Sequence, residues 1–244
     1  MKKLVAVLAL ITFNVHAAPD CRELPSCESL GFICSSEECG DLKALSCPFD
    51  LSKKVCFPKE KECEVGDILY NNLKCYNFGC GKSPIAVVSD TENRIALSID
   101  TRPKLIFGNY GVDIPDLENC TSGLAKTTCD TNGKQNTKII LEYGAANNLE
   151  YPAAEYCNNL TFGNLPAGSW WLPSGKELWT ATKLNADSAI AAYAKLGLTF
   201  PFTEFISSTE NSIANNFHYQ NTGNGDMWAR PKNIQDQVFC AIGY

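Results

Sequence analysis

Hydrophobic and polar residues follow three successive patterns along the chain, which predict strands, then helices, then strands again. After residue 64, the apolar runs at 68–70, 85–88 and 95–99 are short, and the second and third are β-branched. The polar stretch 89–93 has the length of a turn, so the second and third runs are expected to form a β-hairpin. Residues 101–136 are rich in turn-forming residues without apolar alternation, and they are expected to form long irregular loops.

Helical spacing of apolar residues appears first between Thr137 and Leu160. Pro152 interrupts the pattern, which therefore predicts two short helices joined at residues 147–151. Alanine-rich residues 185–196 predict a later helix that ends at Gly197.

A sharper helix start lies between these two regions. Ser174 and Glu177 form a Ser-x-x-Glu capping box directly after a proline. The helix that follows is expected to place Leu178, Trp179 and Leu184 on its apolar side.

Short strand patterns return after Gly197, at residues 205–208, 216–219, 227–230 and 238–242. Because side chains alternate along a strand, only one of the neighbours Met227 and Trp228 should face inward. The same rule predicts that one of Trp170 and Trp171 points into the core and the other outward. The order of strands, helices and strands indicates an α+β fold, in which a few helices pack beside a small twisted antiparallel sheet.

The first 17 residues have the pattern of a signal peptide. Two lysines precede an apolar run at 4–13, and small residues follow, with cleavage expected near Ala17. The apolar run is too short to span a bilayer as a helix, and no later run is long or apolar enough to do so. We therefore expect a soluble secreted, periplasmic or surface-associated protein that does not insert into a membrane.

The 13 cysteines are the most unusual feature of the composition. Seven of them fall between residues 21 and 63, and no C-x-x-C pair occurs, which favours structural disulfides over a zinc site. Cys120 and Cys129 are candidates to staple the loop region. The odd total leaves at least one thiol either buried and inert or bonded to another chain, a possible disulfide-linked partner. The expected organisation is a signal peptide at 1–17, a cysteine-rich module at 18–63 and a main domain at 64–244.

The net charge of −6 changes the range of partners to consider, because an acidic chain lacks the basic face that binds nucleic acid. No nucleic-acid partner is expected.

Four segments of the main domain resemble those of a known family, the bacterial C-type-lectin-like domains at the C-terminus of collagen-like adhesins. They are Tyr151-Pro-Ala-Ala-Glu-Tyr-Cys157, Trp170-Trp-Leu-Pro-Ser-Gly-Lys-Glu-Leu178, Ile206-Ser-Ser-Thr-Glu210 and Phe239-Cys-Ala-Ile242. The fold of that family is related to formylglycine-generating enzymes. The resemblance covers residues 64–244 and implies small twisted antiparallel sheets, two main helices and long loops. It also implies a disulfide between Cys157 and Cys240 and a core position for Trp171. With the motifs Cys27-x-x-Leu-Gly-Phe32 and Lys43-Ala-Leu-Ser-Cys-Pro-Phe-Asp50, the cysteine-rich front resembles a module that precedes such domains in surface proteins of gut bacteria.

Catalysis is disfavoured by the scarcity of suitable residues. A Ser-His-Asp site would need His218, the one histidine after the signal peptide, which the pattern places at a half-exposed strand position. Enzymes that share the resembled fold use a copper site of paired cysteines, and this chain does not supply the matching ones.

The loop around Asn224 and Asp226, with Glu204, Glu210 and Asn211, offers oxygen ligands for calcium, but the pattern is first of all a turn. We therefore expect no catalytic residue, no cofactor and no metal.

The stretch from 211 to 230 mixes amides with flat rings, the combination with which proteins bind sugars and protein surfaces. The alternative is a solvated hairpin with Trp228 in the core. The sequence favours a bacterial binding or adhesion protein that recognises a glycan or protein ligand on a cell surface. A structural envelope component without a specific ligand, or an enzyme of the related fold, is the alternative. The candidate ligand-binding residues are Asn216, His218, Tyr219, Gln220, Asn224, Asp226, Trp228 and Arg230.

Overall fold

The structure is a computed structural model that describes residues 44–47, 50–56, 60–76, 83–100 and 103–244. The chain divides into two compact units between Lys59 and Glu60. In the first unit, β1 (Ala44–Cys47) pairs antiparallel with β2 (Asp50–Cys56). The predicted signal peptide at 1–17 and the cysteines between 21 and 39 lie outside the described residues.

The second unit contains a seven-stranded sheet in the order β10-β15-β7-β6-β4-β5-β3. The predicted hairpin is confirmed, since β6 and β7 pair antiparallel, with Val87 opposite Leu97. The strands are β3 (Glu60–Lys61), β4 (Ile68–Tyr70), β5 (Cys75–Tyr76), β6 (Pro84–Asp90), β7 (Ile95–Ser98), β10 (Trp170–Trp171) and β15 (Ala241–Gly243).

A second sheet has the order β13-β12-β11-β14-β8, and β9 pairs parallel with β11. Its strands are β8 (Lys104–Ile106), β9 (Asn119–Cys120), β11 (Glu204–Asn211), β12 (Asn216–Asn221), β13 (Asp226–Pro231) and β14 (Gln235–Gln237). The prediction that residues 101–136 are irregular is wrong for β8. This strand is short and finds its partner, β14, about 130 residues further along the chain, so local pattern does not reveal it.

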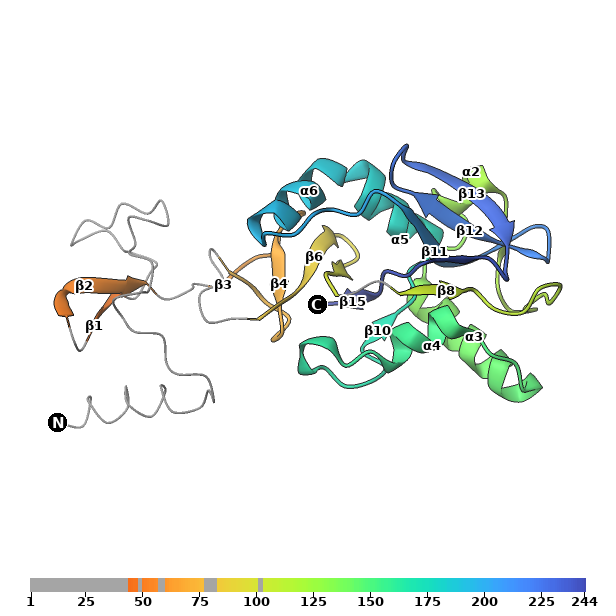
Figure 1. Cartoon of the computed structure of the whole chain (residues 1–244), viewed down its shortest axis with the longest axis horizontal. Helices are drawn as coiled ribbons and strands as arrows, with labels where there is room; N and C mark the ends of the chain where they lie inside the picture. The colour runs from red at the N-terminus through yellow and green to blue at the C-terminus, as the bar shows by residue number, and fades with distance from the viewer. Residues whose placement is uncertain (1–43, 48–49, 57–59, 77–82, 101–102) are drawn as a thin grey trace. The chain divides into compact units, whose positions relative to one another are not determined.

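The main helices lie on two sides of the strands, with α3 and α4 below them and α6 above β4 and β6 in Figure 1. The helical elements are α2 (Ser122–Ala125), α3 (Gly133–Asn147), α4 (Pro152–Asn159), the 3-10 turn η1 (Phe162–Asn164), α5 (Gly175–Trp179), the π-helical turn η2 (Thr180–Leu184) and α6 (Ala186–Lys195). The mixed composition, with more strand than helix elements among the described residues, confirms the α+β prediction. The expectation of purely antiparallel sheets is wrong for the second sheet, because β11 pairs parallel with β9 and β14.

Helix α3 begins four residues before its predicted start. The Asn132 side chain accepts a hydrogen bond from the backbone N–H of Gln135 and caps the helix. Gly133 is buried so close to Glu177 and Ser174 that an added Cβ would collide with both. Pro152 is the first residue of α4, where its missing N–H costs no helical hydrogen bond.

The predicted capping box is present at the start of α5. The Ser174 side chain accepts from the Glu177 N–H, and the Glu177 carboxylate accepts from the Ser174 N–H. Leu178 is completely buried, but the prediction for Leu184 is wrong, since 56% of this residue is exposed. The π-helical turn adds a residue per turn after Trp179 and rotates Leu184 away from the apolar side.

Trp170 and Trp171 are both buried, at 1% and 6% exposure, so the prediction that one points outward is wrong. Trp170 belongs to one hydrophobic cluster and Trp171 to another. Helices cover both faces of β10, so a side chain that points to either face of this strand is buried in a hydrophobic cluster.

Three disulfides join described cysteines, Cys63–Cys75, Cys120–Cys129 and Cys157–Cys240. Cys120–Cys129 is the predicted staple of the loop region, and Cys157–Cys240 is the disulfide that the resemblance implies. The first lies wholly in the second unit, although Cys63 was grouped with the cysteine-rich front. Among the described residues, no helix has the length and apolar character needed to cross a membrane.

Candidate functional site

The predicted ligand-binding residues lie on one hairpin, and its register divides them between two faces. Strands β12 and β13 pair antiparallel, with Tyr219 opposite Trp228 and Asn221 opposite Asp226. Residues opposite one another point to the same side of a sheet. We call the outward part of this side the hairpin face; it consists of Tyr219, Asn221, Asp226, Trp228 and Arg230. Phe217, which lies opposite Arg230 on the same side, is buried.

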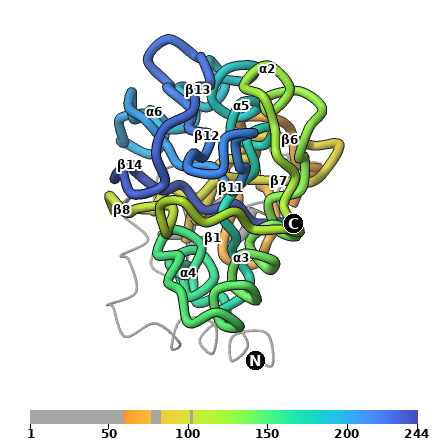
Figure 2. The backbone as a smooth tube through the Cα atoms, turned by 90° about the vertical axis from the view of Figure 1, so that its right-hand side faces the viewer, coloured from red at the N-terminus to blue at the C-terminus, as the bar shows by residue number. Residues whose placement is uncertain are grey.

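Trp228 is the most prominent residue of the hairpin face, with 52% of its surface exposed. Its neighbour Met227 is only 3% exposed, which confirms that one of the two faces inward. Strand β13 is at the edge of its sheet, and Figure 2 shows β13, β12 and β11 in succession above α3 and α4. Trp228 is therefore a large apolar ring held on a rigid strand and open to solvent.

Two predicted contact residues, His218 and Gln220, are completely buried and do not reach the surface. They point to the opposite side of the hairpin, together with Met227. The prediction is wrong for both, because the sequence pattern reads polar strand residues as outward. His218 can be buried on the inner side because β9 lies there, with the Cys120 carbonyl oxygen 3.0 Å from Nε2 of His218.

Burial lowers the pKa of His218, so its ring is neutral at pH 7. Its Nε2–H donates to the Cys120 carbonyl, and the Ser207 hydroxyl donates to the backbone carbonyl of His218 rather than to the ring. His218 is thus a core residue. A substrate has no route to it, and it does not form the nucleophile and base pair that acyl transfer needs.

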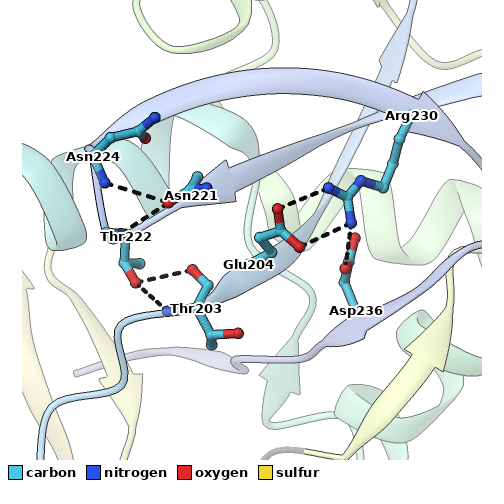
Figure 3. A network of polar contacts seen from close by, with 8 residues as sticks. Thr203, Glu204, Asn221, Thr222, Asn224, Arg230 and Asp236 are labelled. Carbon is cyan, nitrogen blue, oxygen red and sulfur yellow. Dashed lines mark hydrogen bonds and ion pairs between the residues drawn. The ribbon is translucent and has the colours of Figure 1, made fainter.

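Arg230 is held in a network of ion pairs, drawn in Figure 3. Its guanidinium donates two hydrogen bonds to Glu204, at 3.1 and 2.9 Å, and one of 2.7 Å to Asp236. It also lies over the ring of Tyr219, 3.6 Å from the centroid. Burial by itself lowers the pKa of Arg230, but the bonds to Glu204, Tyr219 and Asp236 outweigh it and raise the pKa.

Asp236 makes this network structural. Its side chain is only 5% exposed, and burial raises its pKa despite the Arg230 charge. Without Arg230 the buried carboxylate would lose its cation, which is strongly destabilising. The change Arg230→Ala therefore tests folding rather than recognition, and Arg230 contributes to the hairpin face mainly by fixing Tyr219.

The turn between β12 and β13 is fixed by side-chain hydrogen bonds, also visible in Figure 3. Asn221 accepts from the backbone N–H groups of Gly223 and Asn224. Thr222 donates to the carbonyls of Pro201 and Thr203 and accepts from the Thr203 N–H, which ties the turn to the start of β11. Asn224 is exposed at this turn, whereas Asn216 is half-buried at the other end of β12.

The oxygen ligands considered for calcium are not brought together. Glu210 is completely buried in an ion pair with Lys232 at the far end of β11, whereas Glu204 is engaged by Arg230. Within the described part of the chain, no group of three His, Cys, Asp or Glu residues is placed to hold a metal ion.

A second concave region, which the sequence analysis missed, lies along α3. We call it the α3 groove; it has a volume of about 350 Å³, and its lining includes Asn132, Lys134, Gln135, Lys138, Asn158 and Trp170. Its residues come from α3 and from the segment 158–171, which are separate in sequence. The adjacent tryptophans are the one available signal, and strand alternation predicts only that one of them points outward.

Comparison with known proteins finds no match for this chain among protein-family models, curated proteins or solved structures.

Proposed function

We propose that this protein is a non-catalytic binding protein that recognises a glycan or protein ligand through the hairpin face. The observation that carries the proposal is the 52% exposure of Trp228, on an edge strand whose other face is packed. Exposing a large ring costs solvation free energy of about 25 cal/mol per Å² of apolar surface, which burial by a ligand recovers.

The groups around Trp228 fit such recognition. Asn224 and Asp226 are exposed beside it, and Asn221 is half-buried on the same side. Amides and carboxylates form paired hydrogen bonds with sugar hydroxyls or with peptide groups, while a flat ring covers the apolar surface between them. The fixed turn lowers the entropy that binding must overcome.

We further propose that the domain from about residue 60 to 244 is C-type-lectin-like and belongs to a secreted or surface-associated bacterial protein. The Cys157–Cys240 disulfide between the first helical pair and the end of the chain supports this assignment, as does the capping-box helix after Trp170 and Trp171. Three disulfides among the described cysteines support export, because such bonds persist in oxidising compartments.

The test is a glycan and host-protein array probed with the oxidised mature chain and with Trp228→Ala. We expect selective binding by the wild-type protein and at least a tenfold loss in the variant, with little change in melting temperature because the ring is exposed. The matched control is Tyr110→Ala, which removes another exposed ring, 57% accessible, outside the hairpin face.

A silent array from well-folded protein would contradict the proposal and favour a structural envelope component. Binding that survives Trp228→Ala unchanged would show that the ligand contacts another surface.

A further inference from the structure

The α3 groove is large enough to hold a small ligand. Its volume of about 350 Å³ lies at the lower end of the range for small-molecule sites, enough for one or two sugar rings. It is built on α3, a 15-residue helix, and on β10, so its walls are regular secondary structure rather than loops alone.

Hydrogen-bond donors without partners gather in the groove. The Lys134 ammonium has no carboxylate within ion-pair distance among the described residues. It lies over the ring of Trp171, 5.6 Å from the ring centroid. The Gln135 side chain makes no hydrogen bond to any other described residue. Asn132 uses its oxygen to cap α3, which leaves its amide N–H groups for a ligand.

Acceptors and negative charges are fewer. Glu142 lies 3.8 Å from Lys138 and partly neutralises it, which leaves Lys134 as the uncompensated charge. The carboxylate of Glu177, beneath Trp171, is directed inward, since it accepts from the Trp171 indole and from the N–H groups of Gly133 and Ser174. The N-terminal half of α3 adds the positive end of a helix dipole. The groove therefore favours an acceptor-rich, negatively charged ligand.

We propose that the α3 groove is a second binding site, and that it takes the carboxylate and hydroxyl groups of a uronic acid residue in a glycan. Lys134 pairs with the carboxylate, and the amides of Asn132, Gln135 and Asn158 bind the ring hydroxyls. The site shares no residue with the hairpin face.

The experiment measures binding of trigalacturonate to the oxidised mature chain by calorimetry, with its fully methyl-esterified form as the matched ligand. The ester keeps the size and the hydroxyls but lacks the charge. We expect binding of the acid and at least tenfold weaker binding of the ester. Lys134→Gln should weaken binding of the acid at least tenfold, and Lys134→Arg should retain it.

Steric variants on α3 locate the site. Gln135 is exposed and lines the groove, so Gln135→Trp should fill it and abolish binding. Ala146→Trp is the control, because Ala146 is exposed on the same helix but does not line the groove. It should bind like the wild type, and so should Trp228→Ala, which separates this site from the hairpin face.

Three results would overturn the proposal. They are the absence of uronate binding by folded wild-type protein, equal affinity for the acid and its ester, and binding that persists in Gln135→Trp. Loss of uronate binding in Trp228→Ala with retention in Gln135→Trp would instead assign the uronate to the hairpin face.

Discussion

Two buried carboxylates next to the N-terminus of α3 carry the clearest pH dependence of the molecule. Asp130 is 7% exposed, and both of its oxygens accept from the Asn136 amide, at 2.6 and 2.7 Å. Burial raises the pKa of Asp130 from 3.8 to about 6 and that of Glu177 from 4.5 to about 7. The folded state therefore holds these protons more tightly than the unfolded chain does.

The sign of the effect follows from proton binding. A group whose pKa is raised on folding stabilises the protein below its unfolded pKa, and the contribution declines as the pH rises toward the folded pKa. For Asp130 the window runs from about pH 4 to about pH 6, and for Glu177 it extends to about pH 7.

Asp130→Asn should therefore gain stability relative to the wild type as the pH increases. Asn tolerates the left-handed backbone at this position, φ 57°, and keeps one oxygen for Asn136. Two pKa units correspond to about 3 kcal/mol at most, or several degrees in melting temperature. We expect the difference between variant and wild-type melting temperatures to rise between pH 4 and pH 7. Parallel curves would contradict the assignment.

Single residues also show where sequence reasoning succeeds and fails. The pairing of a buried Met227 with an exposed Trp228 follows from strand alternation alone. The burial of His218 does not, because its partner, the Cys120 carbonyl, is 98 positions away in sequence. Polar residues look outward in a local pattern, and only the tertiary structure shows which of them have buried partners.

Elements defined by local interactions are predictable, and those defined by distant partners are not. The capping box of α5 and the β6–β7 hairpin form from neighbouring residues, and the sequence predicts both. Strands β8 and β14 are three residues each and exist because they pair with each other and β14 pairs with β11. The α3 groove was missed for the same reason, since its walls meet only in the folded chain.

Among the three disulfides in the described part of the chain, Cys157–Cys240 closes the longest loop. It joins α4 to the residue before β15 across 83 positions, and closing a loop of that length stabilises the fold by about 4–5 kcal/mol in the loop-entropy model. The double change of Cys157 and Cys240 to Ala should lower the melting temperature by roughly 10 °C or more.

The matched control is the double change of Cys63 and Cys75 to Ala, which opens a loop across only 12 positions. Its effect should be smaller by about 1 kcal/mol or more. A larger loss from Cys63 and Cys75 would contradict the loop-length argument.

At the scale of the whole molecule, hydrophobic packing and disulfides together stabilise the second unit. The second unit has two extensive hydrophobic clusters, and all six of its cysteines in the described ranges are paired. The other seven cysteines are an odd number, so at least one of them has no partner within the chain. The sequence predicts this division from cysteine spacing, although the units meet at residues 59 and 60 rather than 63 and 64.

Recognition through an exposed ring is the central claim, and oxidative footprinting of Trp228 tests it most directly. The oxidised mature chain would be labelled with and without its strongest array ligand, and the modification at Trp228 and Tyr110 would be quantified by mass spectrometry. We predict that the ligand protects Trp228 and leaves Tyr110 unchanged. Equal modification of Trp228 with and without a saturating ligand would contradict the account.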